Sequence, residues 1–154
     1  MKPILALLAL AAFTANSLAG ELQELFHKER SSLEKIRDEF STVLEVYPDL
    51  NHVDLQSYSP RSIAISPKDF ESIRSMMEVS GVLSVMKGDF SGMDFEDTVY
   101  ILIEYEDHPD IGIQRGFVST KNELGESGKS EDIRFTPIDQ NWYLYERKFE
   151  HELY

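Results

Sequence analysis

The sequence predicts an α+β fold, with a long N-terminal amphipathic helix and a shorter helix packed on one face of a mostly antiparallel sheet of four to six strands. Three observations predict this class: apolar residues recur at helical spacing over residues 21–47, a helix-capping sequence begins at Ser66, and apolar and polar residues alternate from Val82 onward. No internal repeat or linker divides residues 20–154. The sequence therefore predicts a single α+β domain over this range.

The first nineteen residues have the order of regions that is typical of a secretory signal peptide. Lys2 supplies a positive start, residues 3–13 are almost wholly apolar, and Ser17-Leu18-Ala19 supplies the small residues of a cleavage site. Cleavage after Ala19 would leave a mature chain that starts at Gly20. The apolar run is too short to remain as a membrane-spanning helix. We therefore expect a periplasmic or secreted protein without stable membrane insertion.

The two predicted helices differ in length and in the signals that bound them. The longer one covers Glu21–Tyr47, where an apolar stripe recurs every three to four residues and Pro48 disfavours a further turn. The shorter one starts at Ser66-Pro67, because serine caps a helix well and proline suits its first position. Gly81 would end it. Between the helices, His52–Ser66 predicts two short strands around a turn at Ser59-Pro60.

Residues after Gly81 alternate with the period of two that strands require. The alternation in Thr98–Glu106 places Ile101 and Ile103 on one face and Tyr100, Leu102 and Glu104 on the other. Loops rich in charge and glycine interrupt the strands and should be exposed. The predicted strands are 82–86, 98–106, 111–120, 133–138 and 142–149, and the two long loops are 87–97 and 121–132.

Composition limits the partners of the protein. The formal net charge is −13, and a mature chain without Lys2 would keep 14 basic and 28 acidic residues, for a charge of −14. This charge disfavours nucleic acid and anionic membrane surfaces, and it favours a basic protein or peptide. The chain has no cysteine, and no glycosylation acceptor follows residue 19. Both absences favour a bacterial exported protein.

No motif predicts a cofactor, a metal ion or a catalytic group. The segment Gly125–Ser130 lacks the first glycine of a phosphate-binding loop. The acidic stretch Asp89–Asp97 lacks the ligand spacing of a helix-loop-helix calcium site. The four histidines have no spacing typical of metal ligands, and they are His27, His52, His108 and His151. The sequence therefore favours a protein that is not an enzyme.

Aromatic residues are dense in the last predicted strand, and they supply the candidate binding residues. Alternation places Trp142 on one face and Tyr143 and Tyr145 on the other. One hypothesis is a non-enzymatic binding or inhibitory protein, similar to an immunity protein, that engages a basic partner through these strands and the long loops. The alternative is a small ligand-binding protein or enzyme with a pocket between helix and sheet. In that pocket Tyr100, Glu104, Arg115 or Tyr143 would point inward.

A long amphipathic helix followed by a bent antiparallel sheet resembles the cystatin-like and nuclear-transport-factor-2-like folds. It is also similar to small periplasmic inhibitors and immunity proteins of bacteria. The resemblance is one of architecture, and it implies a pocket or a concave surface between helix and sheet. No motif specific to these families is present, so no functional residue is carried over from them.

Overall fold

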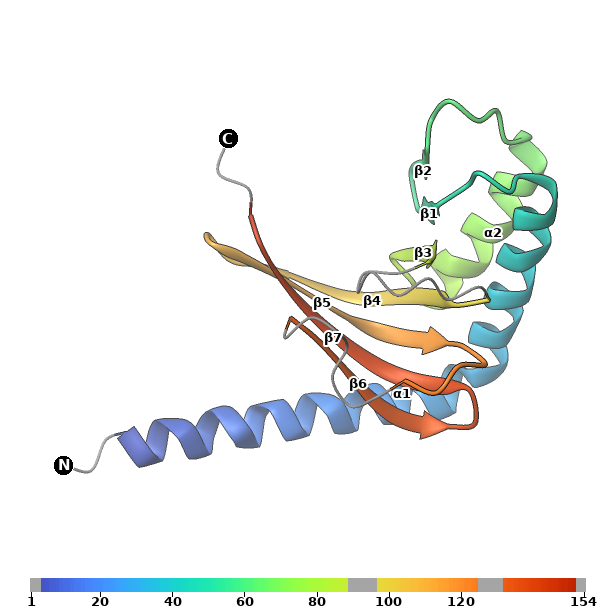
Figure 1. Cartoon of the computed structure of the whole chain (residues 1–154). Coiled ribbons are helices and arrows are strands. Elements are labelled where there is room, and N and C mark those ends of the chain that lie inside the picture. The colour runs from blue at the N-terminus through green and yellow to red at the C-terminus, as the bar shows by residue number, and fades with distance from the viewer. Residues whose placement is uncertain (1–3, 89–96, 125–131, 152–154) are drawn as a thin grey trace.

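The computed structural model describes residues 4–88, 97–124 and 132–151, and for residues 4–17 it describes the backbone. Within these ranges the chain forms two helices and an antiparallel sheet of seven strands in the order β2-β1-β3-β4-β5-β7-β6 (Figure 1). The α+β class is therefore confirmed, and the sheet has more strands than the four to six expected. The elements are α1 (Ile4–Val46), β1 (His52–Asp54), β2 (Tyr58–Ser59), α2 (Pro67–Val79), β3 (Ser84–Lys87), β4 (Val99–Asp107), β5 (Ile111–Ser119), β6 (Ile133–Asp139) and β7 (Trp142–Glu150).

Helix α1 ends where the sequence predicts and begins earlier. It stops at Val46, and a turn follows in which the Leu50 N–H donates to the Tyr47 carbonyl at 3.0 Å. At its other end the helix continues through most of residues 1–19, so the predicted leader and the amphipathic segment form one helix. Cleavage after Ala19 remains a prediction.

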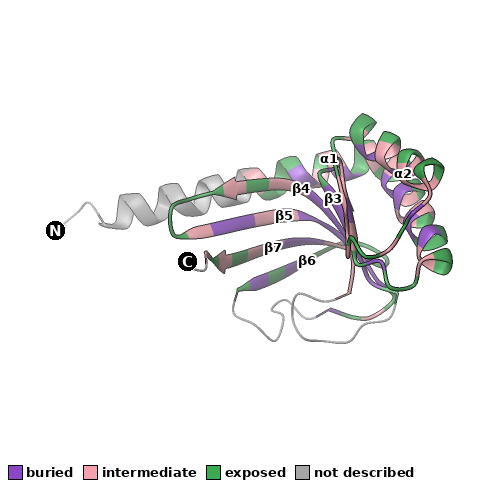
Figure 2. Ribbon diagram, turned by 90° about the horizontal axis from the view of Figure 1, so that it is seen from above, coloured by how far each residue is buried: buried purple, intermediate pink, exposed green. Residues whose placement is uncertain are grey.

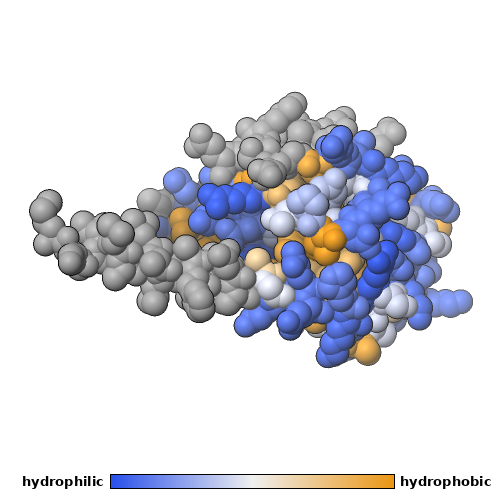
Figure 3. Space-filling model, turned by 90° about the horizontal axis from the view of Figure 1, so that it is seen from below, coloured by the Kyte–Doolittle hydropathy of each residue, from blue (hydrophilic) through white to orange (hydrophobic). Residues whose placement is uncertain are grey.

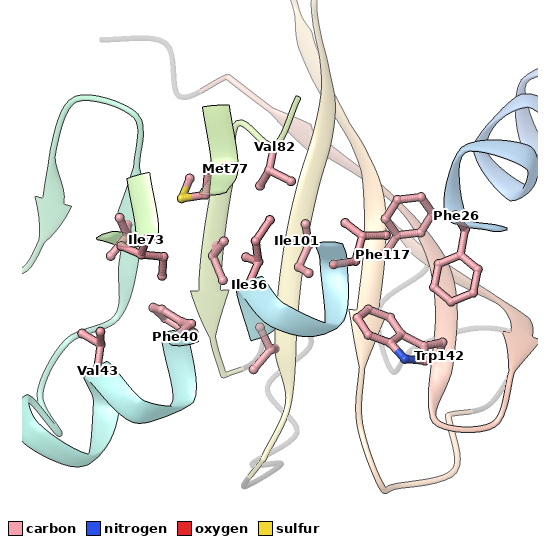
Figure 4. Close-up of a cluster of buried hydrophobic side chains, with 14 of the residues drawn as sticks. Phe26, Ile36, Phe40, Val43, Ile73, Met77, Val82, Ile101, Phe117 and Trp142 are labelled. Carbon is pink, nitrogen blue, oxygen red and sulfur yellow. The ribbon is translucent and has the colours of Figure 1, made fainter. Parts of the chain in front are cut away.

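The apolar stripe of α1 meets the sheet in the main hydrophobic core (Figure 4). The ring of Phe26 lies 5.4 Å from the rings of both Phe117 on β5 and Trp142 on β7. Further along the helix, Ile36 and Phe40 are fully buried in the same cluster. Burying large apolar side chains is the main favourable contribution to folding a chain without disulfides.

Helix α2 starts and ends as its sequence predicts. The Ser66 side chain caps it by accepting a hydrogen bond from the Asp69 N–H at 3.2 Å, and Pro67 occupies the first position. The helix stops before Gly81, whose φ of +68° favours glycine. Its side chains Ile73 and Met77 complete the core beside α1.

The short hairpin between the helices differs from the prediction. Strand β2 is Tyr58–Ser59 rather than residues around Ile63, and the turn precedes Ser59-Pro60. Asp54 forms that turn, because its Oδ1 accepts hydrogen bonds from the N–H groups of Gln56 and Ser57 at 2.8 and 2.6 Å. An aspartate that bonds its own following backbone is a strong turn signal. The prediction placed the turn four residues too late.

The face of the sheet that turns away from the helices carries a second buried cluster. It contains Tyr100, Val118, Tyr145 and the loop residue Leu124, which is only 6% exposed. Leu124 was expected in an exposed loop, and this expectation is wrong for that residue. Most of each long predicted loop lies outside the described residues. These parts are the acidic segment 89–96 and the glycine-containing segment 125–131.

Buried residues are concentrated in the part of the sheet that packs against the helices. The C-terminal ends of β4 and β7 contain fewer buried residues (Figure 2). The far ends of β4 and β7, near Asp107 and Glu150, are therefore more exposed than their starts. Hydrophilic side chains cover much of the described surface in Figure 3, as the high negative charge would suggest. In the described part of the chain, no helix is long and apolar enough to cross a membrane.

Candidate functional site

An irregularity in β4 determines which side chains meet at the exposed end of the sheet. Ile101 pairs with Phe117, but the register shifts after Leu102, so that Glu104 pairs with Arg115. Directly paired residues share a face. Glu104 therefore lies on the helix side with Ile101, and its predicted place beside Tyr100 is wrong. The extra residue of a β-bulge inverts the alternation beyond it.

Arg115 is the centre of the charged cluster that results. Its Nε donates to Glu146 Oε2 at 2.7 Å, its Nη1 donates to Glu106 Oε1, and Nη1 lies 3.8 Å from Glu104 Oε2. The Arg115 side chain is only 13% exposed, whereas the three glutamates keep 32–43% of their side chains exposed. One guanidinium thus contacts three carboxylates, and two of these have a further partner: Lys148 Nζ lies 4.0 Å from Glu146 Oε1, and His108 Nε2 lies 3.3 Å from Glu106 Oε2.

The pairing changes the ionisation of both partners. A hydrogen bond from Arg115 is the largest influence on Glu106, and it holds the pKa of that carboxyl below its ordinary value. Partial burial opposes protonation of Arg115, but hydrogen bonds to Glu146 and Glu106 outweigh it and raise the pKa of the guanidinium. Both groups are therefore charged near neutral pH, and the cluster is an ionic one.

A cavity of about 270 Å³ lies beside this cluster, between α1 and strands β5, β6 and β7. Leu18, Ala19 and Leu22 of α1 form one wall, and Arg115 and Glu146 belong to the other. An apolar wall that faces fixed charged groups is a common arrangement in ligand sites.

The predicted tyrosines lie on the opposite face of the sheet. The rings of Tyr100 and Tyr145 pack edge to face with centroids 5.3 Å apart, and both side chains are 1% exposed. Burial, and then the proximity of Tyr100, raise the pKa of Tyr145. Tyr143 accepts a hydrogen bond from the Leu124 N–H at 3.4 Å. Tyr100 and Tyr143, which the alternative hypothesis pointed into a helix–sheet pocket, thus point away from the helices.

Trp142 lies on the helix face, but it is buried in the core at 1% exposure. The guanidinium of Arg37 on α1 covers its indole at 5.6 Å from the ring centroid. Of the six residues predicted for binding, only Glu104 and Arg115 therefore come together at an accessible place. Glu106 and Glu146 complete this cluster, and neither was among the predicted binding residues. Their proximity to Arg115 depends on strand register, which the sequence does not reveal.

Across the ranges that the structure describes, no group of three or more side chains is arranged to hold a metal ion. Comparison with models of known families gives no match, and comparisons with curated proteins and with solved structures give none either. The fold and the charged cluster are accordingly the basis for inferring function.

Proposed function

We propose that this chain is an exported, non-enzymatic binding or inhibitory protein that engages a basic protein or peptide through the acidic end of its sheet. The observation that carries the proposal is the cluster in which Glu104, Glu106 and Glu146 surround the single guanidinium of Arg115. Asp107, Asp110 and Glu150 lie nearby, at the same ends of β4, β5 and β7, and the acids of this end outnumber its cations Arg115, Arg147 and Lys148.

The chemistry of this acidic end supports a cationic partner. Its carboxylates are held in place by Arg115 but remain partly exposed, so lysine or arginine side chains of a partner can approach them. Because the carboxylates are already held in place before binding, less conformational entropy is lost when a partner associates. The net charge of the whole chain would also accelerate encounter with a basic molecule.

A fluorescently labelled oligolysine peptide tests the location of binding by anisotropy. The double variant E104Q/E106Q removes two charges from the acidic end, and E45Q/E78Q removes two exposed charges from the ends of α1 and α2. We expect the first variant to weaken binding by about tenfold and the second by less than about threefold, because short-range pairs are screened less than distant charges. Equal losses would mean that only net charge matters, and the proposal would fail.

Export is part of the proposal, and the N-terminal sequence pattern supports it. Mass spectrometry of the protein released from the periplasm of a bacterial host should give a chain that begins at Gly20. A chain that retains residues 1–19 would contradict this part. Cleavage would also remove Leu18 and Ala19 from the wall of the 270 Å³ cavity.

That cavity favours a second candidate function, a carrier of a small ligand with an apolar part and a negative charge. The apolar part would contact Leu22 and Leu144, and the charge would lie at Arg134, which lines the cavity from an exposed position. Anilinonaphthalene sulfonate has this chemistry, and its fluorescence should rise on binding. Thr136 lines the cavity from an exposed position, so T136W should block the probe, whereas T42W on the exposed side of α1 should not. Unchanged binding in T136W would exclude the cavity.

A further inference from the structure

A second, polar cavity lies at the other end of the sheet, where α1 passes the end of β5 and the turn between β6 and β7. Its volume is about 320 Å³. Arg37, Asp38 and Ser41 of α1 line one side, and Asp97, Ser119 and Lys121 line the other. This cavity is separate from the acidic end, since it lies where β4 begins and β5 ends rather than at the Arg115 cluster.

Arg37 is held in a fixed orientation at this cavity. Its guanidinium lies over the buried indole of Trp142, 5.6 Å from the ring centroid, and Nη1 donates to Ser119 Oγ at 3.5 Å. Its Nε donates to Asp38 Oδ1 at 2.8 Å, and its Nη2 lies 2.7 Å from the same oxygen. The side chain is 30% exposed, so its planar donor group is anchored from below and accessible from the cavity. Asp38 occupies the Nε side of this guanidinium, so a ligand carboxylate would meet the Nη1–Nη2 edge, which also presents two parallel donors.

Two cations and two carboxylates line the cavity, and their side chains differ in how exposed they are. Arg37 is the least exposed of them, whereas Asp38 and Asp97 are 67% and 73% exposed and lie at the rim. Lys121 is 82% exposed and lies 3.9 Å from Asp97. A simple anion would have to pass two rim carboxylates on a chain of net charge −13. A molecule that carries both a negative and a positive group could place the negative group at Arg37 and the positive group at the rim carboxylates.

We propose that this cavity binds a small zwitterion of the free amino-acid type. Its carboxylate lies against Arg37 and the Ser119 hydroxyl, and its ammonium group lies between the carboxylates of Asp38 and Asp97. The side chain of the ligand occupies the remaining volume. This site is independent of the proposed binding of a basic partner, because the two surfaces share no lining residue.

NMR titration with single free L-amino acids tests the proposal, with acetate and methylammonium as probes that carry one charge each. The Nε–H signal of Arg37, assigned through R37K, reports on the site. We expect at least one amino acid to bind with Kd below about 10 mM, and both single-charge probes to bind at least about tenfold more weakly. Absence of amino-acid binding, or equal binding of acetate, would overturn the proposal.

Two variants and a control locate the binding. R37K keeps the charge but loses the planar donor group, so amino-acid affinity should fall at least about tenfold. Arg74 on α2 also pairs with a nearby carboxylate, that of Glu71 at 2.7 Å, and R74K should leave affinity unchanged. If R37K loses its native circular dichroism, S119A replaces it, with an expected loss of at least about threefold. Retained affinity in the folded variant would place the ligand elsewhere and refute the site.

Discussion

Arg115 Nε and Glu146 Oε2 lie 2.7 Å apart on the neighbouring strands β5 and β7, and the same guanidinium contacts Glu106 on β4. One side chain thus connects three adjacent strands at the end of the sheet that faces the N-terminal part of α1 across the 270 Å³ cavity. None of the charged side chains of the cluster belongs to the main core, and ion pairs join the three strands on this face of the sheet. The cluster combines a structural role with the exposure that a binding surface needs.

Replacing Arg115 with methionine should destabilise the protein by about 1–3 kcal/mol, because three glutamates would lose their shared cation in a partly buried place. Urea unfolding followed by circular dichroism measures this loss. R74Q removes an exposed pair between residues of one helix and should cost less than about 0.5 kcal/mol. Similar losses in the two variants would show that the Arg115 cluster contributes no more than an ordinary surface pair.

The lowered pKa of Glu106 predicts a defined dependence of stability on pH. Because the folded state holds this pKa below the ordinary value of 4.5, the ionised carboxylate stabilises the fold above that pH. The contribution is lost as pH falls through the folded pKa. The stability difference between the native protein and E106Q should therefore be about 1 kcal/mol or less at pH 7, since solvent screens the pair, and it should shrink below pH 4.5. A difference that is constant with pH would contradict the pairing.

Local signals in the sequence predict most of the elements. The apolar stripe and Pro48 place the end of α1, and Ser66-Pro67 places the start of α2, since both depend on nearby residues alone. The last four strands, β4 to β7, also lie within one or two residues of their predicted bounds. The turn at Asp54 was missed because serine and proline at positions 59–60 gave a competing signal.

The candidate site was harder to predict because it depends on strand register. The sequence indicates that Glu104 and Arg115 are on adjacent strands, but the bulge after Leu102 decides that they share a face. Glu146 lies on β7, and it contacts Arg115 only because β7 rather than β6 pairs with β5. A pairing order of this kind is a property of the whole sheet.

Gly116 marks the same irregularity, and its replacement tests it. A Cβ at Gly116 would lie 2.0 Å from the Ile101 carbonyl oxygen, which is backbone and cannot move alone. We expect G116A to destabilise the protein by about 3 kcal/mol or more. At Gly112 a Cβ would meet the ring of Phe149, which is a side chain that can rotate, so G112A should cost less. Thermal unfolding of both variants decides the order, and a larger loss in G112A would contradict the close approach of β4 and β5.

Leu124 provides a test of the second buried cluster and of the loop that contains it. Ile101→Ala in the main core should cost about 2–5 kcal/mol, and L124A should cost about 2 kcal/mol because its side chain is buried against the outer face of the sheet. Charge reversal at the exposed neighbour Lys121 should change stability by less than about 0.5 kcal/mol. Chemical denaturation of the three variants gives the comparison. A loss in L124A as small as that in K121E would mean that the loop does not pack on the sheet in solution. The buried environment of Tyr100 and Tyr145 would then be in question as well.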